Sequence, residues 1–144
     1  MNKNKFLLKS YTDIAPSGVV DLAYKLAENL IGKSFMHVNS TKMGGGVAEM
    51  LQRLIPMFNE LGIKTRWEVI EGTSLFYKTT KCFHNALQGQ EQNITQEMYE
   101  EYKKINDLNC KKILFDADFT IIHDPQPAAF INKKPKKSFW FWRY

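Results

Sequence analysis

The sequence predicts an α/β fold: a mostly parallel, Rossmann-like sheet with flanking helices. Short apolar stretches typical of buried strands alternate with longer stretches whose apolar residues recur every three or four positions. The chain has 144 residues, which fits one domain with a core of its own. Its composition, 44% hydrophobic and 24% charged, argues against disorder and against a membrane protein.

The first two elements are expected before residue 40. Residues 17–31 keep the apolar spacing of a helix, with Ser17 as a suitable N-cap and Gly32 as a stop. A short strand follows from Ser34 to Asn39. We assign residues 1–33 to an N-terminal extension and helix, and residues 34–144 to the Rossmann-like domain.

A glycine-containing loop then leads into a helix and a second strand. The helix is expected from Val47 to Leu61, where apolar residues recur at helical spacing. Pro56 lies inside it and should kink it or end its regular part. The strand is expected from Ile63 to Ile70, with Trp67, Val69 and Ile70 as core candidates.

The remaining elements complete the alternation. Two helices, a buried strand, a short helical segment beginning at Pro125 or Pro127, and an aromatic strand are expected in that order. The helices and strands cover Leu75–Leu87, Thr95–Leu108, Phe119–His123 and Phe139–Tyr144.

Two polar segments follow predicted strands directly, at Asn39–Gly46 and at His123–Gln126. Ligands of parallel α/β sheets bind outside the carboxyl ends of the strands, where the strand order reverses. We therefore expect the two segments to share one crevice.

The glycine loop itself, Gly44-Gly45-Gly46, suits a phosphate or another anion. Glycines let the backbone turn with positive φ, and the helix that follows offers free N–H groups. The loop has neither the Walker spacing nor the G-x-G-x-x-G pattern, so a tight turn without a ligand remains an alternative.

The second polar segment offers His123, Asp124 and Gln126, whose side chains can hydrogen-bond sugar hydroxyls. The alternative is a core histidine followed by a helix-capping aspartate. A third stretch, residues 83–89, places His84 and Gln88 four apart on one helical face. Because no further ligands lie nearby, we expect no metal here and favour a helix end with a glycine stop.

Charge and cysteines bound the partners and the compartment. The net charge is +5, with lysines clustered at both ends: Lys3, Lys5, Lys9 and Lys133, Lys134, Lys136, Lys137. Such clusters can bind nucleic acid, but solvated surface is the commoner role, and nucleic-acid binding is the third hypothesis. The two cysteines suggest reduced thiols, and no signal peptide or membrane span is found, so a cytoplasmic location is expected.

Several stretches together resemble the archaeal and bacterial trehalose synthases of the glycosyltransferring type. The similarity keeps order and spacing from about residue 34 to the end, and it is loose over the first 33 residues. The stretches are His37–Thr41, Gly44–Glu49, Arg66–Trp67, Val69–Gly72, Phe83–Gly89, His123–Ala129 and Phe139–Arg143.

The resemblance implies a retaining glycosyltransferase of the two-domain GT-B fold, which moves glucose from a nucleotide-diphosphate glucose onto glucose. It implies no resident cofactor and no metal. His123 would meet the sugars at the reacting centre, as a hydrogen-bonding and charge-stabilising group. The substrate-binding candidates it implies are Asn39, Gly44, Gly45, Gly46, Glu49, Asn85, Gln88, Asp124 and Gln126.

Such enzymes have a second, donor-binding domain, and nothing in this chain matches it. We therefore expect the 144 residues alone to be inactive, with glucose or trehalose as ligand and a missing C-terminal domain or a second chain as partner. The alternative is a non-catalytic module that binds a sugar, a phosphate or a partner. A homodimer through the aromatic terminal strand is then a suitable substitute.

Overall fold

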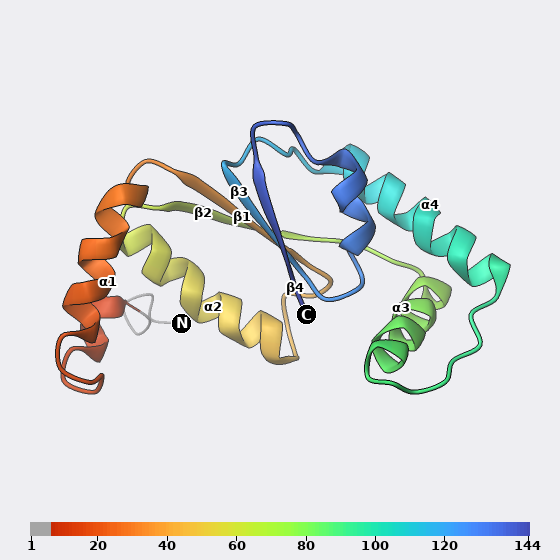
Figure 1. The fold of residues 1–144 in the computed structure, drawn as a ribbon, viewed down its shortest axis with the longest axis horizontal. Coiled ribbons are helices and arrows are strands. Elements are labelled where there is room, and N and C mark those ends of the chain that lie inside the picture. The colour runs from red at the N-terminus through yellow and green to blue at the C-terminus, as the bar shows by residue number, and fades with distance from the viewer. Residues whose placement is uncertain (1–6) are drawn as a thin grey trace.

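The computed structural model describes residues 7–144 and confirms the α/β class (Figure 1). Lys3 and Lys5, part of the N-terminal lysine cluster, lie outside the described residues. All strand pairs are parallel, in the order β2-β1-β3-β4. The strands are β1 Ser34–Asn39, β2 Lys64–Val69, β3 Phe119–His123 and β4 Phe139–Arg143.

The α-helices are α1 Val19–Ala27, α2 Gly46–Glu60, α3 Ser74–Leu87 and α4 Gln96–Lys112. Within residues 7–144, three 3₁₀ helices accompany them: η2 Leu8–Tyr11, η3 Glu28–Leu30 and η4 Ala128–Lys133. The predicted bounds of β1 and β3 are confirmed to the residue. The predicted bounds of α2 and α3 differ from the observed ones by one residue.

Two local predictions were wrong for identifiable reasons. Gly18, not Ser17, is the N-cap of α1, because its φ of 80° turns the chain into the helix one residue later. The helix α2 includes Pro56 and continues to Glu60, one residue short of the predicted end, and a kink at Pro56 stays a prediction. The helix α4 runs past Leu108 because Asn109 extends its buried face, where its amide donates to the Glu71 carbonyl at 2.8 Å.

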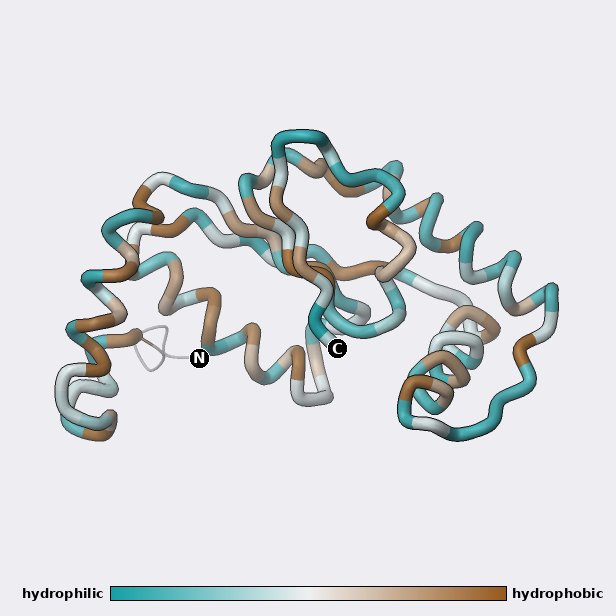
Figure 2. Tube along the Cα trace, in the orientation of Figure 1, coloured by the Kyte–Doolittle hydropathy of each residue, from teal (hydrophilic) through white to brown (hydrophobic). Residues whose placement is uncertain are grey.

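One face of the sheet carries the hydrophobic core. Met36 and Val38 of β1 and Ile122 of β3 pack with residues of α3, α4 and η4, including Phe76 and Phe130. All five are at most 3% exposed. Figure 2 shows the hydrophobic stretches where the strands run together at the centre. The burial of apolar side chains such as these is the main stabilising contribution to a domain of this kind.

The other face is packed by α2, where Phe58 contacts the ring of Phe35 edge-on at 5.6 Å. Of the predicted core residues of the second strand, Ile70 is buried, whereas Trp67 and Val69 are half-buried. Figure 1 shows α2 on the opposite side of the molecule from α3 and α4.

The strand order reverses between β1 and β3. From β1 the chain goes through α2 to β2 on one side, and then through α3 and α4 to β3 on the other side of β1. Val38 pairs with Ile122, so Asn39 and His123 end neighbouring strands at the same edge. The two polar segments therefore start from neighbouring strands, at the switch point where α/β sheets bind ligands. That they share one crevice stays a prediction.

Candidate functional site

A polar pocket of about 280 Å³ lies between α3 and the segment after β3. From α3 come Tyr77, Thr80, Lys81 and His84, and from the other wall Asp124, Pro125 and Gln126. The four α3 residues are spaced at i, i+3, i+4 and i+7, so they share one helical face. Amide, carboxylate, imidazole and hydroxyl groups converge here, which suits a neutral polyol.

Asp124 is held in an unusual conformation at the wall of this pocket. Its φ is 64°, and no other non-glycine residue that the structure describes has a positive φ. Its N–H donates to the Arg143 carbonyl at 2.9 Å, and its own carbonyl accepts from the Trp142 indole at 3.0 Å. Strain of this kind, about 1 kcal/mol or more, persists where the surroundings fix a functional group.

The carboxyl of Asp124 is also electrostatically distinct. Burial raises its pKa above the ordinary value, while the positive charges of Arg143 and His84 act in the opposite direction. A half-buried carboxyl beside two basic groups is the kind of group that functional sites contain.

Gln126 presents an unused acceptor. Its side-chain Oε1 is buried and has no hydrogen-bond partner within residues 7–144, while its backbone carbonyl accepts from Asn106 at 3.1 Å. The Tyr102 hydroxyl donates to the Pro125 carbonyl at 3.0 Å and accepts from the Ala129 N–H at 3.1 Å. The segment from Pro125 to Ala129 is thus anchored to α4, which leaves the Gln126 amide oxygen free for a ligand.

The end of α3 contacts the end of β4 through Tyr144. Its hydroxyl lies 3.3 Å from His84 Nδ1 and donates to the His84 carbonyl at 3.1 Å. The Gln88 amide donates to the same hydroxyl at 2.9 Å. Gln88 therefore supports His84 and does not line the pocket, and the half-buried Asn85 does not line it either.

His123, the last residue of β3, is paired with His37 of β1. Each side chain is 1% exposed, and His37 Nδ1 is 3.0 Å from His123 Nε2. The rings stack with their centroids 5.3 Å apart. Burial is the main cause that lowers the pKa of both rings to about 4, and for His123 the electrostatic effects of His37 and Arg143 contribute to that value. Both rings are therefore neutral at pH 7.

The glycine loop lies at the same sheet edge, on the α2 side. Gly44 and Gly45 have φ of 74° and 85°, which other residues rarely adopt. No atom lies within 4 Å of a Cβ built at Gly44, Gly45 or Gly46, so the loop is open to a ligand. The α2 N-cap, Gly45, supplies no side-chain hydrogen bond, so the first N–H groups of α2 remain for solvent or an anion.

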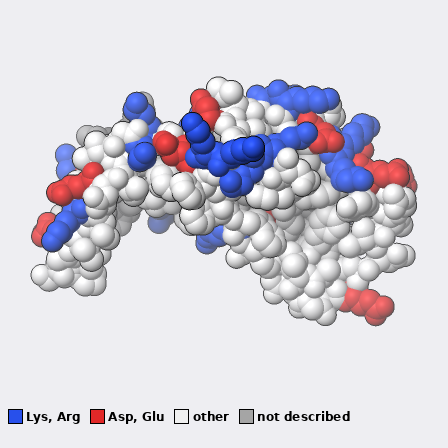
Figure 3. Space-filling model, turned by 45° about the horizontal axis from the view of Figure 1, so that its top comes forward, with Lys and Arg blue, Asp and Glu red and all other residues white. Residues whose placement is uncertain are grey.

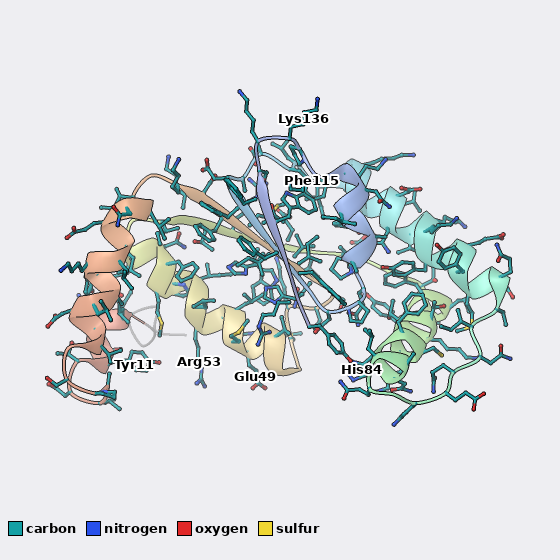
Figure 4. The ribbon with its side chains drawn as sticks, in the orientation of Figure 1. Tyr11, Glu49, Arg53, His84, Phe115 and Lys136 are labelled. Carbon is teal, nitrogen blue, oxygen red and sulfur yellow. The ribbon has the colours of Figure 1, made fainter. Side chains whose placement is uncertain are left out.

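Two candidates beside the loop have structural surroundings of their own. Asn39 is buried, and its amide donates to the Thr41 carbonyl at 2.8 Å and accepts from the Trp67 indole at 2.7 Å. Its polar atoms therefore shape the loop. Glu49 is exposed in the first turn of α2, on the side away from the sheet (Figure 4), where a carboxylate stabilises a helix N-terminus.

His37 and most of the α3 wall were not among the site residues predicted from the sequence. The signal for the wall was present, because residues 77, 80, 81 and 84 are polar at helical spacing. His37 gave no such signal, since its partner is 86 positions away in the sequence. Only the register of β1 against β3 brings the two rings together.

The remaining features lie apart from the pocket. Figure 3 shows several Lys and Arg side chains over the upper part of the molecule, where Figure 4 places Lys136. The connection that carries this lysine cluster precedes β4, at the opposite sheet edge from the pocket. Within residues 7–144, no three His, Cys, Asp or Glu side chains are placed to hold a metal ion. No helix in that range is both long and apolar enough to cross a membrane.

The comparison with protein families matches residues 37–144 to the N-terminal domain of trehalose synthase. The trehalose synthase of Pyrococcus horikoshii is 48% identical, over 99% of this chain and 35% of that protein. That of Rubrobacter xylanophilus is 34% identical, over 99% of this chain and 36% of that protein. A trehalose phosphorylase of Pleurotus pulmonarius is 32% identical, over 66% of this chain and 14% of that protein. The chain spans about a third of the length of the trehalose synthases it matches.

Proposed function

We propose, from the premise that this chain belongs to the trehalose synthase family through its N-terminal domain, that it forms the acceptor side of a retaining glycosyltransferase. The proposed reaction transfers glucose from a nucleotide-diphosphate glucose to glucose and gives trehalose. The observation that supports it is the polar pocket between α3 and the segment after β3, at the switch point of the sheet.

Each wall of the site has a part in this proposal. The Asp124 carboxylate and the unpaired Gln126 oxygen accept hydrogen bonds from glucose hydroxyls, and His84 contributes from α3. The glycine loop and the open N-terminus of α2 approach the donor diphosphate. The role of His123 as a charge-stabilising group then depends on its unpaired Nδ1, since its Nε2 faces His37. The roles of Asn39, Glu49, Asn85 and Gln88 as sugar contacts stay predictions.

Transfer itself requires both substrates to be held together. About two thirds of the length of the related trehalose synthases lies outside the matched region. We therefore infer that the 144-residue chain binds the acceptor but does not transfer glucose without a donor-binding partner. A cytoplasmic location fits the free thiols of Cys82 and Cys110 and is part of the same proposal.

The test is an amide NMR titration of the ¹⁵N-labelled chain with glucose and then with trehalose. Saturable shifts should cluster at His84, Asp124 and Gln126. Asp124→Asn replaces the carboxylate by a neutral amide, in a residue type that also tolerates positive φ. It should weaken binding about 10- to 100-fold, since hydrogen bonds to charged groups contribute about 1.5–3 kcal/mol. If neither sugar shifts any amide signal, the chain does not bind the acceptor and the proposed function is wrong.

Asp107→Asn is the matched control. Asp107 is exposed on α4 and does not line the pocket, so this variant should bind glucose like the unmodified chain. Equal weakening by both variants would mean that general charge, and not the pocket, governs binding.

A second candidate is a phosphate-dependent reaction, favoured by the similarity to the fungal trehalose phosphorylases. Inorganic phosphate would then bind at Gly44–Gly46, at the N-terminus of α2. Titration with inorganic phosphate and with a nucleotide-diphosphate glucose distinguishes the two. Saturable shifts at Gly44–Gly46 with phosphate alone favour the phosphorylase-like reaction.

A further inference from the structure

The C-terminal end of β4 contacts both walls of the polar pocket without lining it. The Trp142 indole N–H donates to the Asp124 carbonyl at 3.0 Å, on the wall that follows β3. The Tyr144 hydroxyl donates to the His84 carbonyl at 3.1 Å, on the wall formed by α3, where Figure 4 labels His84. Asp124 and His84 both line the pocket, whereas the two aromatic residues do not.

The two aromatic side chains also contact each other. Their rings stack with the centroids 5.9 Å apart and an interplanar angle of 30°. The Gln88 amide donates to the Tyr144 hydroxyl at 2.9 Å, so two residues at the C-terminal end of α3 hold this hydroxyl. A continuous series of contacts therefore runs from Asp124 through Trp142 and Tyr144 to His84. We call Trp142 and Tyr144 the aromatic brace.

Packing alone does not account for the aromatic brace. Trp142 is 53% exposed and Tyr144 is 46% exposed, and neither belongs to the hydrophobic core. By contrast, Trp140 of the same strand packs against the core, where its ring lies 5.2 Å from that of Phe115. Side chains that stay half in solvent bury less apolar area and so contribute less to stability. The polar atoms of the brace are nevertheless both used, on opposite walls of the pocket.

Asp124 depends on β4 for both of its backbone hydrogen bonds. Its N–H donates to the Arg143 carbonyl at 2.9 Å, and its carbonyl accepts from Trp142. Its left-handed backbone, with φ of 64°, persists in a non-glycine residue where the surroundings hold it. The next residue, Pro125, is anchored separately, because its carbonyl accepts from the Tyr102 hydroxyl of α4. The aromatic brace thus acts on Asp124, and α4 acts on the segment after it.

We propose that the aromatic brace positions the pocket, by holding Asp124 and His84 at a fixed separation on opposite walls. Trp142 and Tyr144 are positioning residues, because they act on a sugar only through the two residues that they hold. The brace therefore sets the width that a sugar ring must match. This role toward sugar rests on the proposed function. The link between the walls does not, because it follows from contacts within the chain.

Hydrogen exchange of the Trp142 indole N–H tests the link without any sugar. The chain has three tryptophans, so Trp142→Phe assigns the signal in the ¹H–¹⁵N spectrum. Tyr144→Phe keeps the ring and removes the hydroxyl that bonds α3. The indole N–H of Trp142 should then exchange about fivefold faster, the value of one ordinary hydrogen bond, while that of Trp140 stays unchanged. An unchanged exchange rate at Trp142 would overturn the proposal.

Glucose affinity, measured by amide NMR titration, tests the positioning role. Trp142→Phe and Tyr144→Phe should each weaken binding about fivefold, again the value of one ordinary hydrogen bond. The double variant should lose no more than the larger single loss, because either change breaks the same series of contacts. Losses that multiply to about 25-fold would mean that the two residues act independently, which would contradict the proposal.

Trp140→Phe is the matched control. The Trp140 indole donates to Ser138 Oγ at 3.0 Å, so this variant loses the same type of hydrogen bond from the same strand, away from the pocket. It should lower the urea midpoint and leave glucose affinity unchanged. Equal weakening of binding by Trp140→Phe and Trp142→Phe would overturn the positioning role, since general stability would then govern affinity.

Two further outcomes keep the proposal separate from the proposed function and from misfolding. If the unmodified chain does not bind glucose, the proposed function is wrong, and the exchange rate of Trp142 alone decides whether the brace links the walls. If Trp142→Phe loses amide dispersion, Tyr144→Phe decides, because it removes a single hydroxyl from a half-exposed side chain.

Discussion

The two faces of the sheet differ in what they bury. The face toward α3 and α4 carries the hydrophobic core, in which Phe76 is 0% exposed. The face toward α2 is covered over β1 and β2, whereas Phe139 and Phe141 of β4 are 64% and 55% exposed. The α2 face also buries His37 and His123. The hydrophobic core thus lies on one face, and the buried histidine pair lies on the other.

The largest expected effect lies on the face toward α3 and α4. Phe76 is fully buried and stacks against Tyr102, with ring centroids 5.9 Å apart. Phe76→Ala should lower the free energy of unfolding by about 3–5 kcal/mol, because it leaves a cavity that the helices cannot fill. Urea unfolding followed by circular dichroism measures the change.

Ile122→Val is the graded control on the same face, and it should cost about 0.5–1.5 kcal/mol. If this variant and Phe76→Ala had equal, small effects, the face would be loosely packed and the contrast between the two faces would fail.

The next effect comes from the histidine pair on the opposite face. Their folded pKa of about 4 lies below the ordinary 6.5, so the unfolded chain takes up protons between these values and the folded chain does not. Stability is therefore fully present above pH 6.5 and falls toward pH 4, by on the order of 3 kcal/mol for each ring. Asp124, whose pKa burial raises, acts in the opposite sense at lower pH.

Urea midpoints measured across this pH range test the prediction. His37→Phe should reduce the slope of stability against pH, since one of the two titrations is removed. A slope that is flat in the unmodified chain would mean that the rings are protonated while folded, in conflict with their burial. His84→Gln should leave the slope in place, because His84 is outside the buried pair.

The same contrast explains what the sequence could and could not predict. Alternating apolar stretches were enough for the parallel α/β class and for the bounds of β1 and β3, because these depend on local pattern. The polar segments after β1 and β3 were expected to share one crevice from the switch-point rule, which depends on element order alone, and the strands that carry them are neighbours. The end of α4 was missed because Asn109, a polar residue, belongs to its buried face.

The pairing of His37 with His123 could not be predicted in this way. It depends on the register between strands that are far apart in the chain, and no single-sequence pattern encodes that register. The α3 wall of the pocket has a polar pattern at helical spacing, but its distance from Asp124 is fixed by packing on α4 and not by that pattern. Sequence patterns therefore predicted the polar residues at the carboxyl ends of β1 and β3, but not His37 or the α3 residues that complete the site.

Two glycines give a smaller and more selective contrast between the faces. A Cβ at Gly72 would overlap the ring of Phe76, so Gly72→Ala should destabilise the chain by about 1–3 kcal/mol. A Cβ at Gly46, the first residue of α2, meets nothing within 4 Å, so Gly46→Ala should leave stability unchanged or raise it by up to about 1 kcal/mol. The two urea midpoints, measured side by side, decide. A loss at Gly46 comparable to that at Gly72 would mean that the glycine loop is packed and not open.

The smallest effect is expected on the exposed part of the α2 face. Phe139→Thr places a β-branched residue of high strand propensity in β4 and removes a ring that is mostly in solvent, so the free energy of unfolding should change by no more than about 0.5 kcal/mol. The ring does stack on Phe119 at 5.7 Å, and that contact sets the upper limit.

Fluorescence of an apolar dye should fall in this variant, because exposed apolar surface is what such dyes bind. A loss of several kcal/mol together with a concentration-dependent midpoint would show instead that this surface is covered in solution by a second copy of the chain. The contrast between the faces would then belong to the monomer alone.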